Sequence, residues 1–62
     1  MTGKELIAKL QKDGWKLERV SGSHHIMTKA GCKPASVPVH GGKEITPGTL
    51  NKLLRDTGLK GR

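Results

Sequence analysis

The sequence predicts a single α+β domain in which one helix, three strands and a second helix follow one another. Apolar residues recur at helical spacing near both ends of the chain, and residues in the middle alternate between apolar and polar. Glycines and prolines separate these segments. With 62 residues, the chain is near the lower size limit for a stable core, so residues 1–62 form one domain. The most economical packing places both helices on one face of a three-stranded antiparallel sheet.

The first helix begins at a capping box and ends at a glycine. Thr2 and Glu5 have the spacing at which each side chain accepts from the other residue's amide. Leu6 and Leu10 belong to an apolar stripe, and Gly14 is a typical C-terminal stop.

The three strands are expected over residues 15–20, 23–29 and 35–40. Alternation from Trp15 onward suits a strand with one buried face, and Ser21-Gly22 indicates a tight turn into a hairpin partner. Residues 29–34 should form a loop. Pro38 lacks an amide for the ladder, so the third strand belongs at an edge or a bulge.

The second helix is expected after the Gly-Gly pair at residues 41–42. Thr46 is a candidate N-cap, and Pro47 suits the first helical position. Leu50 and Leu53 continue at helical spacing, and Gly58 is the expected stop.

The charge of the chain points to a polyanionic partner. Twelve Lys and Arg residues against five Asp and Glu residues give a net charge of +7. A nucleic acid is the natural partner of such a surface, although the basic residues form no tract and also suit an ordinary soluble surface. Because Tyr and Phe are absent, contacts to phosphate are favoured over base stacking. Lys16, Arg19 and Lys29 are the RNA-binding candidates because they lie in the expected hairpin.

Cysteine usage and hydropathy favour a cytoplasmic protein without a cofactor. Cys32 is the single cysteine, so no internal disulfide can form. No apolar run is long enough for a signal peptide or a membrane span. Cys32 also lacks the spacing of a zinc ligand and the signature of an activated nucleophile, so we expect no metal.

Two adjacent histidines follow the expected turn, where residues 22–25 read Gly-Ser-His-His. Histidine can exchange protons near neutral pH, as RNA cleavage by the RNA's own 2′-hydroxyl requires. Neighbouring strand residues point to opposite faces. If Ile26 faces the core, then His25 lies on the open face; if Met27 does, then His24 lies there. This reasoning leaves both alternatives open.

Four ordered segments together resemble the HicA toxins of bacterial type II toxin-antitoxin systems, also called the YcfA-like mRNA interferase family. The matching segments are Asp13-Gly14-Trp15, Gly22-Ser23-His24-His25, Val37-Pro38-Val39-His40 and the run from Pro47 to Leu54. The resemblance implies a double-stranded-RNA-binding-domain-like fold. It also implies an endoribonuclease that cleaves mRNA and arrests translation, and a HicB antitoxin that neutralises it in a hetero-oligomeric complex.

The resemblance also ranks the candidate site residues. It makes His24 the first choice for the catalytic histidine and His25 the second, with Gly22 and Ser23 in the turn that positions them. We expect a metal-independent endoribonuclease; the alternatives are a non-catalytic RNA-binding regulatory module and a purely structural interaction domain. His40 could assist the site or cap a loop.

Overall fold

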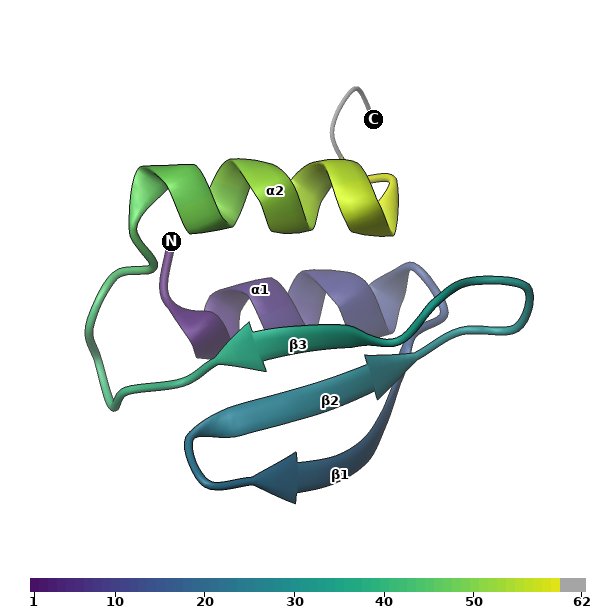
Figure 1. Ribbon diagram of the computed structural model, residues 1–62, viewed down its shortest axis with the longest axis horizontal. Helices are drawn as coiled ribbons and strands as arrows, with labels where there is room; N and C mark the ends of the chain where they lie inside the picture. Colours follow the sequence, from purple (N-terminus) through teal and green to yellow (C-terminus); the bar gives the residue numbers. More distant parts are fainter. Residues whose placement is uncertain (60–62) are drawn as a thin grey trace.

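The computed structural model describes residues 1–59 and has the expected order of elements. The elements are α1 (Gly3–Lys12), β1 (Lys16–Ser21), β2 (His24–Thr28), β3 (Ala35–Pro38) and α2 (Pro47–Thr57). The strands form one antiparallel sheet in the order β1-β2-β3. In Figure 1, α1 lies behind β3, and the face of the sheet turned toward the viewer carries no helix. The predicted α+β class is therefore confirmed.

The capping box at the start of α1 is formed as expected. The Thr2 hydroxyl accepts from the Glu5 amide at 3.2 Å, and the Glu5 carboxylate accepts from the Thr2 amide at 2.8 Å. Hydrogen bonding of the Glu5 carboxylate, first to the Thr2 amide and then to the Thr2 side chain, lowers the pKa of Glu5 below its ordinary value. The helix ends at Lys12, and Gly14, with φ of +99°, turns the chain toward β1.

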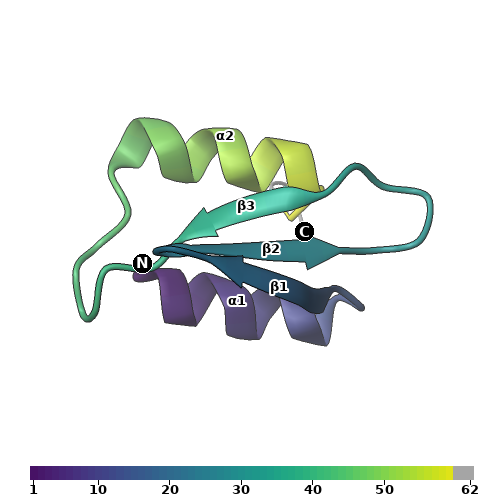
Figure 2. The same cartoon turned by 60° about the horizontal axis from the view of Figure 1, so that its bottom comes forward.

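Strand β1 differs from the expected half-buried strand. Leu17 pairs with Met27 and Arg19 with Ile26, so Glu18 is an extra residue in a β-bulge that interrupts the alternation. Leu17 and Val20 are 44% and 53% exposed. The expected buried face of this strand is thus wrong. Both helices contact β3 instead, and β1 lies at the far edge of the sheet. Figure 2 shows α2 running alongside β3.

The core lies where the two helices meet β2 and β3. Its members are buried side chains from every element except β1. They are Leu6, Leu10, Trp15, Met27, Ala35, Val37, Ile45 and Leu53. The core is thin, as expected for so short a chain.

Helix α2 begins and ends where the sequence predicts, with Thr46 as its N-cap. Thr46 has the extended backbone of an N-cap, and Pro47 occupies the first turn. The Thr46 side chain makes no capping bond; its hydroxyl donates to the Thr49 hydroxyl at 3.1 Å instead. Thr46 is therefore the N-cap, as expected, but its side chain does not bond to the helix backbone. Gly58, with a left-handed φ of +77°, ends the helix.

The start of α1 packs directly on the end of β3. A Cβ atom on Gly3 would lie 2.3 Å from the Pro38 carbonyl oxygen and 2.8 Å from the Val39 side chain. Beside this contact, the Ile45 amide donates to the Met1 carbonyl at 2.9 Å. The N-terminal residues therefore hold both ends of the loop between β3 and α2.

We expect Gly3→Ala to destabilise the fold by about 1–3 kcal/mol, because the added methyl group meets backbone that cannot move without shifting β3. Thermal unfolding followed by circular dichroism measures the change. Gly42→Ala is the matched control, because its Cβ would meet nothing within 4 Å. Equal melting temperatures for the two variants would contradict this account of the close packing.

The capping box makes the stability of the fold depend on pH. The lowered pKa of Glu5 means that its ionised form is favoured by folding, so this contribution is present above the unfolded-state pKa and is lost as the pH falls through the folded-state value. Glu5→Gln should therefore lower the melting temperature at pH 7 and have little effect at pH 3. Melting curves of both proteins at the two pH values test this, and a deficit that persists at pH 3 would exclude the ionised cap as its cause.

Candidate active site

Burial on β2 decides which of the two adjacent histidines faces outward. Met27 is fully buried on the helix-covered face, and Val37, the register partner of His25 in β3, is fully buried as well. Because side chains alternate along a strand, His25 shares the face of Met27, and His24 lies on the open face. The burial agrees, since His24 is exposed and His25 is half-buried.

A two-residue hairpin turn brings the chain into this strand. Gly22 and Ser23 are the two loop residues between β1 and β2, and Gly22 has φ of +59°. Among residues 1–59, no residue other than glycine has a positive φ. The turn therefore requires glycine at position 22, and it pairs His24 with Ser21 at the closed end of the hairpin.

His24 has a hydrogen-bonding partner on β3 that the sequence patterns do not predict. The Ser36 hydroxyl lies 3.3 Å from His24 Nδ1. This bond orients the ring and leaves Nε2 as the nitrogen that can meet a substrate. Because Val37 is buried, its neighbour Ser36 faces the open side of the sheet. Predicting its contact with His24 would also have required the register between β2 and β3.

His25 occupies a different environment. Its Nδ1 atom is buried, and no hydrogen-bonding partner for it exists among the described residues. Its neighbours across the sheet are Val20 and Val37. An imidazole with a buried, unbonded nitrogen between two valines is placed for packing, away from the open face.

Two of the three basic candidates lie on the open face with His24. Lys16 pairs with Thr28 and Arg19 with Ile26, and both partners alternate with His24 along β2. At about 3.3 Å per residue, Lys16 lies about 13 Å along the strand from His24. Arg19 forms a 2.7 Å ion pair with Glu18, but both side chains are about half exposed or more. Such a surface pair is weak, so a phosphate can compete for Arg19.

The third candidate, Lys29, lies at the end of the hairpin away from His24. Its ammonium lies 3.3 Å from the Asp13 carboxylate, and 30% of its side chain is exposed. Lys29 and Lys16 line one shallow hollow, together with Gly14, Thr28 and Ala30. The structure thus brings two basic candidates together but separates them from the histidine.

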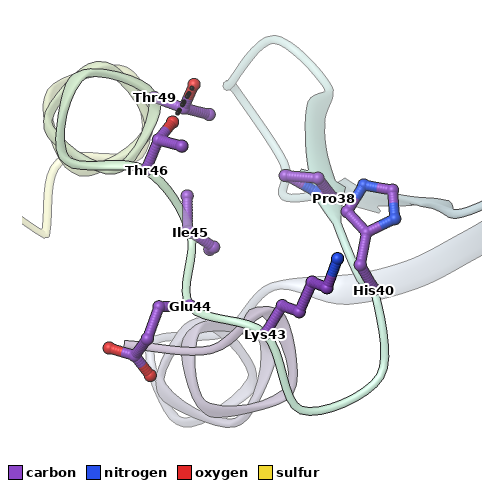
Figure 3. Close-up of a pocket in the computed structure, with 7 residues that line it drawn as sticks. All are labelled: Pro38, His40, Lys43, Glu44, Ile45, Thr46 and Thr49. Atoms are coloured by element: carbon purple, nitrogen blue, oxygen red, sulfur yellow. Dashed lines mark hydrogen bonds between the residues drawn. The ribbon is translucent and has the colours of Figure 1, made fainter.

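A pocket of about 220 Å³ lies between the end of β3 and the start of α2. Figure 3 shows the Lys43 side chain extending toward Pro38 and His40, whereas the Glu44 carboxylate turns away. Glu44 pairs with the N-terminal ammonium group. Ile45, Thr46 and Thr49 complete the lining. The pocket adjoins the open face through Pro38, which is the register partner of His24.

The surroundings of Cys32 and the spacing of the possible metal ligands give no support for a cysteine nucleophile or a metal site in the described part of the chain. Cys32 is a free, exposed thiol in the loop before β3. Among residues 1–59, no three His, Cys, Asp or Glu side chains gather closely enough to hold a metal ion. Over the same part of the chain, no helix has the length and apolarity that crossing a bilayer requires.

Comparison with known protein families now places the chain. Residues 3–59 match the family described as HicA toxin of bacterial toxin-antitoxin. The chain belongs to the HicA toxin family. No curated protein matches it by sequence. As a HicA toxin of a toxin-antitoxin pair, it has an antitoxin as its partner.

The different surroundings of the two histidines predict different effects on stability. His25→Leu should leave the free energy of unfolding unchanged or raise it by about 1 kcal/mol, because it removes a buried nitrogen without a partner. His24→Ala should change it by less than about 0.5 kcal/mol, because the side chain is exposed. Urea titrations measure both values. A large loss of stability in His25→Leu would mean that the buried ring makes a contact the fold requires.

Proposed function

We propose that this HicA-family protein is a metal-independent endoribonuclease that cleaves mRNA and so arrests translation in the cytoplasm. The observation that carries the proposal is the position of His24. It is an exposed imidazole on the open face of the sheet, held through Nδ1 by Ser36, in a chain of net charge +7. Membership of the HicA toxin family supports the same activity.

His24 would act by proton transfer at the scissile phosphate. When the 2′-oxygen of RNA attacks the neighbouring phosphorus, a base must take the 2′ proton and an acid must protonate the departing 5′-oxygen. The Nε2 atom of His24 is free for either transfer, because Ser36 engages the other nitrogen. Cleavage by this route yields a 2′,3′-cyclic phosphate and a 5′-hydroxyl.

The RNA would be held mainly through its phosphates. Lys16 and Arg19 lie on the same face as His24, and Lys29 is near Lys16 at the far end of the hairpin. No aromatic side chain is available on this face for stacking, since the single aromatic residue, Trp15, is buried. Binding should therefore weaken steeply with added salt.

The antitoxin partner, which we propose to be a HicB protein in a hetero-oligomeric complex, would neutralise this site by covering the open face. His24 projects from a sheet face that carries no helix. A protein that binds there would exclude RNA without distorting the fold.

The decisive test is RNA cleavage by the purified chain and its histidine variants. His24→Ala should lower the cleavage rate by about 10²–10⁴, the usual contribution of one acid or base. His25→Leu is the matched control and should cleave within a few fold of the wild-type rate. Gel electrophoresis of a labelled RNA, with end-group analysis, measures rate and product.

Further arms separate the alternatives. Cleavage should persist in the presence of a chelator and should stop when the 2′-oxygens of the RNA are methylated. Loss of cleavage in the chelator would indicate metal-dependent chemistry. RNA that is bound but never cut, by wild type and variants alike, would identify a non-catalytic RNA-binding module and overturn the proposed function.

A further inference from the structure

The segment after β3 continues alongside the hairpin turn and carries His40 two residues beyond Pro38, the register partner of His24. The Val39 amide donates to the Ser23 carbonyl at 2.7 Å, so the pairing of β2 and β3 extends one residue beyond the strand. Val39 packs against the core. Because side chains alternate along extended chain, His40 then projects to the same side as Pro38, and its side chain is exposed.

Pro38 relates the two histidines to each other. It is the register partner of His24, and His40 lies two residues further along the same chain. In antiparallel pairs, such diagonal neighbours lie about 7–8 Å apart. Side chains whose Cα atoms lie this far apart can bring their imidazoles to opposite sides of one phosphate group, each within the reach of about 3 Å that proton transfer requires.

The pocket behind His40 suits the charge that develops during cleavage. Lys43 extends toward His40 and Pro38, and the carboxylate of the adjacent Glu44 turns away from the pocket toward the N-terminal ammonium group. A positive charge therefore stands beside the phosphate position without a carboxylate of the pocket to neutralise it. At about 220 Å³, the pocket is smaller than the roughly 300 Å³ at which drug-sized ligand sites begin. It has room for one phosphate and part of its nucleoside.

We propose that His40 is a second catalytic residue and that it forms an acid-base pair with His24. This inference rests on the proposed ribonuclease function. One imidazole takes the proton of the 2′-hydroxyl while the O2′–P bond forms, and the other, as imidazolium, gives its proton to O5′ while the P–O5′ bond breaks. The two rings end in exchanged protonation states and return to their starting states by exchange with water. Lys43 stabilises the extra negative charge on the phosphate oxygens.

The experiment compares an ordinary RNA with one whose leaving oxygen is replaced by sulfur. The wild-type chain first maps a cleavage position in an RNA oligonucleotide, and that RNA is then made again with a 5′-bridging sulfur at this position. A thiolate departs without being protonated, so cleavage of this substrate does not require the general acid. Single-turnover rates are measured for wild type, His24→Ala, His40→Ala and His40→Gln.

On ordinary RNA, each histidine variant should be slower than wild type by about 10²–10⁴. On the sulfur substrate, the variant that lacks the acid should recover to within about tenfold of wild type, and the variant that lacks the base should stay slow. His25→Leu, which removes an imidazole from the helix-covered face and leaves the pocket intact, should cleave both substrates at nearly the wild-type rate.

Three results would overturn the role of His40: wild-type cleavage by His40→Ala, a failure of both variants to recover on the sulfur substrate, or a loss that is fully explained by weaker RNA binding in fluorescence anisotropy. Circular dichroism melts of both His40 variants show whether they fold. A wild-type chain that binds RNA without cutting it would overturn the ribonuclease function itself. A chain that depends on His24 but not on His40 would overturn only the pair.

Discussion

The burial of Met27 and Val37 beneath the helices is the constraint on which the site depends. These two side chains are fully buried at the centre of the sheet, where both helices contact β3. Because side chains alternate along a strand, the positions between the buried residues face the other way, and His24 and Ser36 both point outward. A slip of one residue in the register would bury His24 and expose Met27. The same hydrophobic burial that stabilises the fold therefore orients the histidine.

A second constraint acts at the end of β3. Gly3 lets the first turn of α1 lie directly against the Pro38 carbonyl and the Val39 side chain. The Met1 carbonyl also accepts from Ile45, on the far side of the loop. Residues far apart in the sequence thus fix the segment that carries His40 and Lys43. Because Gly3 has no side chain, α1 can approach the end of β3 closely, and this contact defines the path of the loop that follows. A loop of that length and glycine content would not have one defined path on its own.

The sequence predicted the order of the elements because each has strong local signals. The capping box, Gly14, Pro47 and Gly58 all work within a few residues, and each marked a helix end correctly. The bulge at Glu18 has no such signal, since it depends on how β1 pairs with β2. The exposure of Leu17 likewise follows from where the helices lie and could not be deduced from the alternation of the strand itself.

The choice between the two adjacent histidines shows where local inference stops. Periodicity established that they face opposite ways, but Ile26 and Met27 are both apolar, so either could have faced the core. Tertiary packing selects Met27. The partner of His24, Ser36, lies twelve residues away in another strand, and only the register between β2 and β3 brings it within hydrogen-bonding distance.

The small size of the chain explains why the candidate chemistry lies on an open surface. Among residues 1–59 the core has eight buried apolar side chains, and a core of this size is too small to enclose a substrate cavity. A sheet with one covered face needs only that face for stability, and the other is free to carry polar and basic groups. Under the proposed function, an antitoxin that covers this face can block RNA by contact alone, because His24 and Ser36 are already hydrogen-bonded there. Neutralisation of this kind requires no change of fold, so release of the partner restores the open face at once.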